Sequence, residues 1–279
     1  MSVARGADGV ADTVLGSSRR RPMTADSTSP TPPVNTRDSR AVLRYLIALW
    51  ESQDLTEEVS FLSERVQAGL AVWALTSHAV ECGRAVLTLY NAKQPIAAAP
   101  VVRLLLEDAV TAGWLVVYPQ NFRALVKKGV DERRKLFKEL MARDGFEDWA
   151  AAAHDDALAL ADELRDAGGF VLEQRMKELA GTDGLYSHYR LLTRLSHAGT
   201  GVVDLYLMTD DRSPAGVGLR TFGALPEAGG TIGIAAAMLN AALIAWDCSR
   251  VQRRWETELT TLAERMGVST EWRPADDNS

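Results

Sequence analysis

Apolar residues recur at helical spacing over most of the chain. Between residues 38 and 52, Val42, Leu46, Leu49 and Trp50 fall on one stripe, which is typical of an amphipathic helix. The same period predicts further helices over about 56–90, 95–118, 121–142, 146–167, 170–180, 185–197 and 232–266. Few segments show strand patterning, so we predict an all-α fold, a multi-helix bundle.

Capping and helix-breaking residues mark the limits of these helices. Asp38 or Ser39 is a candidate N-cap for the first helix. Pro95 stands at the start of the third helix, where a missing N–H is tolerated, and Pro119 follows its end. Glycines separate the later helices, and the "GTG" at 199–201 indicates a helix break rather than a phosphate-binding loop.

The chain is predicted to divide into three parts. Residues 1–36 are mainly Ser, Thr, Pro, Gly and Arg, so they bury too little apolar surface to offset their ordering entropy and are expected to be disordered. Residues 37–267 form a single all-helical domain. Residues 268–279 form a C-terminal tail in which Trp272 is a candidate to dock onto the body.

The most hydrophobic segment, "GGTIGIAAAMLNAALIAW", is uncharged but rich in Gly and Ala and contains Asn240. A membrane span needs about 20 strongly apolar residues, so we interpret this segment as a buried core helix and expect no membrane partner. Cys82 and Cys248 lie within apolar helical patterns, which is typical of a reduced, cytoplasmic protein. The net charge of −6 leaves nucleic-acid contacts to local basic residues.

A polar stripe stands out in the segment 185–197. Tyr186, Arg190, Thr193, Arg194 and His197 recur at steps of three and four, so they share one helix face. In a functional interpretation an arginine binds a phosphate or carboxylate while His197 exchanges a proton near neutral pH. In a structural interpretation the same groups bond to neighbouring elements or face solvent.

A second polar group is the pair Arg103 and Glu107, one turn apart on a helix expected to be buried. A buried arginine keeps its charge and needs a carboxylate partner, for which Glu107 is the nearest candidate. Arg84 or Glu81 from the preceding helix could join them. The pair is interpreted as structural or as part of a binding site.

A third group, His78, Glu81 and Cys82, carries metal-ligand types at helical spacing. No second ligand pair lies nearby in sequence, so we expect a satisfied histidine and a core cysteine rather than a metal site. The chain also lacks a Walker loop, a dinucleotide-binding glycine motif, a Cys-x-x-Cys pair and a nucleophile elbow. No cofactor is expected.

The order of "RLLLEDAVTAGWLV" and "YSHYRLLTRLSHAGTG" resembles a bacterial family of all-helical proteins of unknown function. That resemblance implies an all-α fold and no established activity. More loosely, Arg190 followed by His197 is similar to the motif of the HEPN superfamily, in which a histidine follows an arginine after four to six intervening residues. Leu191 departs from the polar residue usual after that arginine.

The HEPN resemblance implies metal-independent ribonuclease activity in phage defence or a toxin–antitoxin system. Arg190 would stabilise phosphate charge and His197 would move a proton, across a cleft between the subunits of a homodimer. RNA would approach through local basic residues, namely Lys127, Lys128, Arg133 and Arg134. Our first hypothesis remains a polar interaction or ligand site of unknown specificity, formed by Arg190, His197, Arg194, Tyr186, Arg103 and Glu107, and the sequence leaves open whether the protein is an enzyme.

Overall fold

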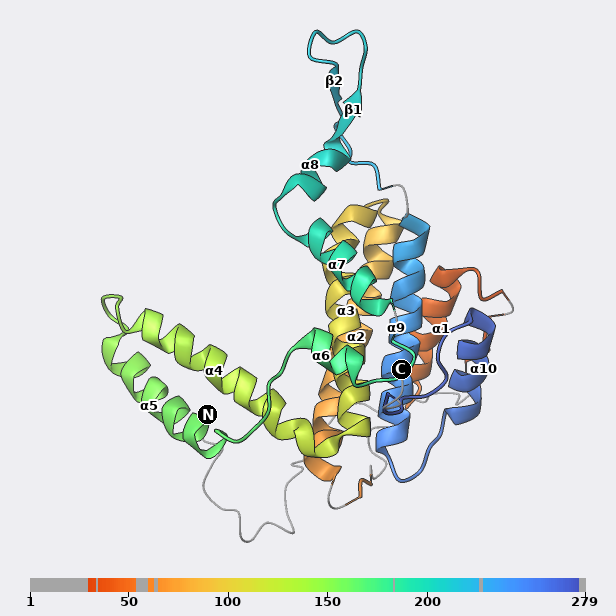
Figure 1. Cartoon of the computed structure of the whole chain (residues 1–279). Coiled ribbons are helices and arrows are strands. Elements are labelled where there is room, and N and C mark those ends of the chain that lie inside the picture. Colours follow the sequence, from red (N-terminus) through yellow and green to blue (C-terminus); the bar gives the residue numbers. More distant parts are fainter. Residues whose placement is uncertain are drawn as a thin grey trace, which may run out of the picture.

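The computed structural model describes residues 30–33, 35–53, 60–62, 65–182, 184–225 and 228–275. These residues form ten α-helices, a short 3-10 helix and one two-stranded sheet (Figure 1), so the predicted all-α, single-domain fold is confirmed. The elements are α1 (Ser39–Glu51), α2 (Val66–Asn91), α3 (Pro95–Val117), η2 (Pro119–Asn121), α4 (Phe122–Leu140), α5 (Glu147–Glu163), α6 (Leu172–Lys177), α7 (Leu185–Ser196), α8 (Thr200–Tyr206), β1 (Leu207–Thr209), β2 (Val217–Leu219), α9 (Ala228–Ser249) and α10 (Glu256–Met266).

The core lies where α2, α3 and α9 pack along one another, with α1 and α10 beside α9 (Figure 1). Thirteen of the 23 residues of α3 and thirteen of the 22 residues of α9 are buried, because both helices are apolar on more than one side. The first helix, α1, buries only one stripe, and its N-cap is Asp38, whose carboxylate accepts hydrogen bonds from the backbone of Arg40 and Ala41. The predicted cap is therefore confirmed.

Helix α9 is the buried core helix that its composition predicted. Within the described residues it alone is long and apolar enough to cross a membrane. Its side chains instead fill the centre of the bundle, where Leu239 and Leu243 are fully buried. The amide of Asn240, also fully buried, donates to the carbonyl of Leu259 in α10 (3.4 Å).

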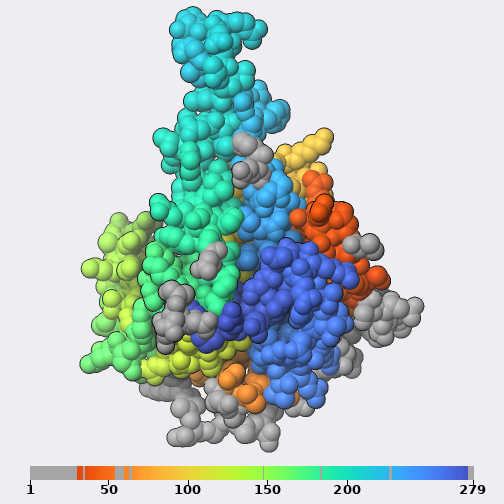
Figure 2. Space-filling view, turned by 45° about the vertical axis from the view of Figure 1, so that its right-hand side comes forward, coloured from red at the N-terminus to blue at the C-terminus, as the bar shows by residue number. Residues whose placement is uncertain are grey.

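Two structures project from this core. Helices α4 and α5 form a hairpin with a small apolar cluster of its own, built on Val130, Ala157 and Leu164. At the opposite end of the bundle, α8 and the β1–β2 hairpin form an arm, residues 200–225, that stands clear of the body in Figure 2. The strands pair antiparallel, with Leu207 opposite Leu219. The helical period predicted no element between residues 197 and 232.

Three basic residues of α4 pair with acids of their own helix. Lys127 lies 3.1 Å from Asp131, and Lys128 lies 3.0 Å from Glu132. Arg134 also approaches Asp131, at 3.9 Å. These pairs reduce the free positive charge that α4 offers to RNA.

Two helix boundaries were predicted wrongly. The helix expected from residue 56 begins at Val66, and residues 60–62 are not helical. The helix expected over 232–266 stops at Ser249, and α10 begins at Glu256. The break is held by the buried carboxylate of Asp247, which accepts hydrogen bonds from the backbone N–H groups of Arg254 (2.9 Å) and Trp255 (3.2 Å).

Most of the N-terminal tail that we expect to be disordered, residues 1–29, lies outside the described residues. The C-terminal tail packs against the body through Trp272, as predicted. The indole of Trp272 donates to the carbonyl of Ala241 (2.9 Å), and it covers Gly113 of α3 so closely that a Cβ there would overlap it. Backbone bonds between residues 273–275 and 178–180 fix the tail beside the end of α6.

Candidate functional site

The centre of the candidate site is the Arg103–Glu107 pair on α3. Arg103 Nη2 lies 2.9 Å from Glu107 Oε1, which confirms the predicted partnership. The side chains are 23% and 32% exposed, so the pair is half-buried rather than fully buried as expected. Arg84 does not join it, because its guanidinium binds Glu51 of α1 at 2.6 Å.

Helix α7 lies across α3 and adds two groups to this pair. Arg103 Nη2 donates to the hydroxyl of Tyr189 (3.1 Å), and the guanidinium lies 5.1 Å from the centre of the Tyr189 ring. Arg103 Nη1 lies 3.5 Å from Nε2 of His197, the exposed residue that caps the C-terminus of α7. A guanidinium and an imidazole therefore stand side by side at the surface.

Arg175 of α6 is the residue that the sequence interpretation missed. Its guanidinium is buried, donates to the Thr111 hydroxyl and stacks 3.9 Å from the centre of the Phe170 ring. Burial lowers the pKa of Arg175 to about 10, although the nearby charge of Glu107 opposes this shift. The helical period places Arg175 on the same side as the apolar Leu172, and that signal could have identified it as buried.

Polar atoms in this cluster retain unused hydrogen-bonding capacity. Among the described residues, Arg103 Nε, Glu107 Oε1 and Arg175 Nε are buried and have no hydrogen-bond partner. The 2.9 Å contact between Arg103 and Glu107 is thus an ion pair without hydrogen-bond alignment. Buried polar groups in folded proteins are nearly always bonded, so this concentration requires an explanation.

The rest of the predicted polar stripe points to other partners. Arg194 binds Asp204 of α8 at 2.9 Å. Arg190 is exposed and interacts electrostatically with Glu173 and Tyr186.

Tyr186 contacts the cluster by stacking its ring on that of Tyr189. The two ring centres lie 6.1 Å apart, and a hydrogen bond to Glu173 raises the Tyr186 pKa. Arg190 and His197 are two helical turns apart, about 10 Å along the axis of α7. The structure therefore brings His197 to Arg103, and Tyr186 flanks them.

The group predicted as His78, Glu81 and Cys82 consists in the structure of His78, Asp108 and Cys82. His78 Nδ1 lies 2.7 Å from Asp108 Oδ2 on α3, and Cys82 Sγ lies 3.9 Å from His78 Nε2. Asp108 thus takes the place expected of Glu81. The histidine is satisfied by this contact, as the structural interpretation predicted.

Burial favours the protonated forms of Cys82 and Asp108. Burial raises the pKa of the Cys82 thiol to about 12, and the charge of Asp108 adds to the shift. Burial also raises the pKa of Asp108 to about 6, against the lowering effect of His78. The three ligand atoms lie within 4.8 Å of one another, so their types suit a zinc ion, but the Asp108 carboxylate is already bonded to His78.

A family model described as a family of unknown function (DUF5677) matches residues 70–214, or 145 of the 279 residues. The match contains Arg103, Glu107, Arg175, Tyr189 and His197. No curated protein and no solved structure matches the chain.

Proposed function

The chain belongs to the family of unknown function DUF5677, and from the geometry of its α3–α7 site we propose that it binds an anionic ligand there, of the phosphate or carboxylate class. The observation that carries this proposal is the 3.5 Å approach of Arg103 Nη1 to the exposed His197 Nε2. Arg103 and a protonated His197 would both donate to the oxygens of one anion placed between them, and charge-assisted bonds of this kind are strong.

The charges of the cluster are consistent with this ligand class. Arg103 and Arg175 supply two positive charges, and Glu107 and Glu178 supply two negative charges, so a positive balance requires a protonated His197. Protonation of His197 beside a guanidinium becomes more favourable when an anion lies between them.

Histidine NMR can test the proposal, because the chain has only four histidines. Titration with inorganic phosphate, and separately with acetate, should shift the ring signals of His197 saturably. His188 is an internal control, since it is exposed on the same helix and its Nδ1 lies 3.0 Å from the carbonyl of Gly184. A His197→Gln variant assigns the signal.

Two arginine variants complete the test. Arg103→Gln should abolish the shift of His197, whereas Arg84→Gln should leave it unchanged because Arg84 pairs with Glu51 away from the site. A His197 response no larger than that of His188, or one that survives Arg103→Gln, would count against the proposed site. Melting curves of both variants check that the fold is kept.

RNA cleavage is a second candidate function, favoured by the exposed imidazole beside a guanidinium. The 2′-hydroxyl of RNA would attack the adjacent phosphorus, with His197 accepting its proton, and the P–O bond to the 5′-oxygen of the next nucleotide would break. Arg103 would stabilise the charge on the phosphate oxygens. The products would be a 2′,3′-cyclic phosphate and a 5′-hydroxyl, with the departing oxygen taking a proton from solvent.

This chemistry differs in one residue from what the HEPN resemblance implies, since Arg103 rather than Arg190 stands next to His197. Purified protein incubated with total RNA, with and without EDTA, should cleave equally in both conditions. His197→Ala and Arg103→Gln should lose at least about 100-fold of the rate, while Arg190→Ala should stay near wild type. Loss of activity in EDTA, or full activity in His197→Ala, would reject this mechanism.

A further inference from the structure

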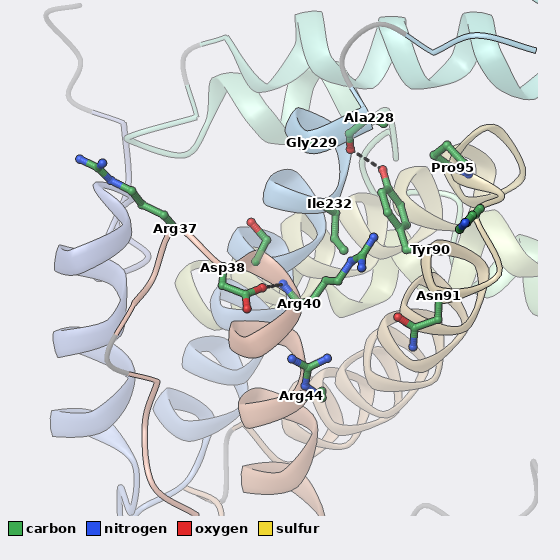
Figure 3. Close-up of a pocket in the computed structure, with 12 residues that line it drawn as sticks. Arg37, Asp38, Arg40, Arg44, Tyr90, Asn91, Pro95, Ala228, Gly229 and Ile232 are labelled. Atoms are coloured by element: carbon green, nitrogen blue, oxygen red, sulfur yellow. Dashed lines mark hydrogen bonds between the residues drawn. The ribbon is translucent and has the colours of Figure 1, made fainter.

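A cavity of about 760 Å³ opens at the end of the bundle where α1 and α9 begin and α2 meets α3 (Figure 3). Its lining includes Arg37, Arg40 and Arg44 from the start of the chain's first helix and Lys93 from the α2–α3 turn. In Figure 3, Arg40 and Arg44 reach into the space between α1 and α2, with Arg37 at the far rim. The cavity is separate from the α3–α7 site, with which it shares no lining residue.

The lining of this cavity is strongly unbalanced in charge. Among the described lining residues, four are cationic and one, Asp38, is acidic, a difference of three positive charges. The Asp38 carboxylate is already bonded to the backbone N–H groups of Arg40 (3.0 Å) and Ala41 (3.1 Å) as the helix cap. Among the described residues, none of the four cations forms an ion pair with an acid, in contrast to the paired lysines of α4.

The backbone around the cavity is held in place and adds to the positive potential. The hydroxyl of the buried Tyr90 donates to the carbonyl of Ala228 (2.6 Å), which ties the end of α2 to the start of α9. The N-termini of α1 and α9 both lie at the rim. The Asp38 carboxylate caps that of α1, so only the helix dipole of α9 adds to the positive potential. Like charges gathered in this way repel one another, and a multiply charged anion removes the repulsion.

We propose that this cavity binds the di- or triphosphate group of a small-molecule ligand. Small-molecule sites commonly occupy about 300–1,000 Å³, so the cavity has the right size. Arginine is well suited to phosphate because its guanidinium donates two parallel hydrogen bonds to the oxygens. An excess of three positive charges matches an oligophosphate better than a singly charged anion.

Isothermal titration calorimetry with inorganic tripolyphosphate tests the proposal at constant ionic strength. In the His197→Gln variant, which weakens the α3–α7 anion site, tripolyphosphate should bind with a stoichiometry of one and at least about 10-fold more tightly than orthophosphate, since it can contact several of the cations at once. ATP and adenosine form two further arms. Binding of ATP at least as tight as that of tripolyphosphate, together with no binding of adenosine, supports an oligophosphate site, whereas equal binding of adenosine and ATP contradicts it.

Variants assign the binding to the cavity. Arg40→Ala and Arg44→Ala should each weaken tripolyphosphate binding about 10-fold or more, the loss that corresponds to one charge-assisted contact. Arg165→Ala is the matched control, because Arg165 is an exposed arginine on the α4–α5 hairpin that pairs with Asp162. Arg40 and Arg44 are exposed, so their replacement should leave the melting temperature near wild type.

The outcomes separate this site from the α3–α7 site. His197→Gln should bind tripolyphosphate with unchanged affinity, whereas a loss in that variant would place the ligand elsewhere. Absence of saturable binding, or equal losses in Arg40→Ala and Arg165→Ala, would overturn the proposal. Neither result would bear on the His197 titration with orthophosphate.

Discussion

Among single residues, Asp108 is a buried carboxylate whose titration affects stability. Its side chain is 12% exposed and bonded to His78, and burial raises its pKa from 3.8 to about 6. The folded protein therefore holds the proton of Asp108 more tightly than the unfolded chain does. This residue contributes stability that is present below about pH 4 and lost as the pH rises through about 6.

Asp108→Asn should remove this pH dependence because the amide does not ionise. Relative to wild type, the variant should gain up to about 3 kcal/mol of unfolding free energy between pH 4 and pH 7. Urea denaturation at pH 4, 5.5 and 7 measures the difference. Asp166→Asn, at an exposed aspartate that pairs with Arg123, is the control and should show no such trend; a constant difference between Asp108→Asn and wild type would refute the assignment.

The predictable part of the candidate site is the part that lies within one helix. Arg103 and Glu107 could be paired from sequence because residues four apart always face the same way on a helix. The contact of Arg103 with Tyr189 and His197 could not be predicted, since it depends on how α7 crosses α3. The same limit explains why Asp108 rather than Glu81 was found beside His78.

At the scale of elements, most helices followed from periodicity, while α8 and two helix boundaries did not. The segment 232–266 keeps a helical pattern and has no proline, so nothing in its composition marks the break after Ser249. The break depends on Asp247, 2% exposed, which forms a buried ion pair with Arg250 and accepts two backbone hydrogen bonds. Arg250 in turn stacks between the rings of Trp246 and Trp255.

Asp247→Ala should destabilise the protein by about 3–5 kcal/mol. The substitution leaves the buried Arg250 guanidinium without its carboxylate partner, and it removes the acceptor of two backbone N–H groups. Asp204→Ala provides the matched control. Asp204 forms a comparable pair with Arg194, but both side chains are about 60% exposed, so the loss should stay below about 1 kcal/mol. Chemical denaturation measures the unfolding free energy of both variants. Similar losses would show that burial does not determine how much an ion pair contributes to stability.

At the scale of the whole molecule, the C-terminal tail closes the bundle by joining distant segments. Trp272 reaches the carbonyl of Ala241 on α9 and covers Gly113 on α3, while its neighbours bond to the backbone after α6. The sequence suggested that an aromatic residue in a polar tail would dock. It could not show where, because the receiving surface is assembled from helices more than 100 residues apart.

Gly113 and Trp272 should therefore behave as one unit. A Cβ at Gly113 would overlap the indole, so Gly113→Ala should lower the unfolding free energy by about 1–3 kcal/mol. Gly129→Ala on α4 is the matched control. The nearest atom to its new Cβ would be 4.0 Å away, and alanine favours helix, so this change should be neutral or stabilising by up to about 1 kcal/mol.

A double-mutant cycle separates overlap with the indole from other effects of the new methyl group. In the Trp272→Ala background the indole is gone, and Gly113→Ala should lose most of its penalty and approach the behaviour of Gly129→Ala. Urea denaturation of the four proteins gives the coupling energy, expected at about 1 kcal/mol or more. A penalty that persists without the indole would mean that Gly113 is required by α3 itself, and the docking of Trp272 would then lose its role in closing the bundle.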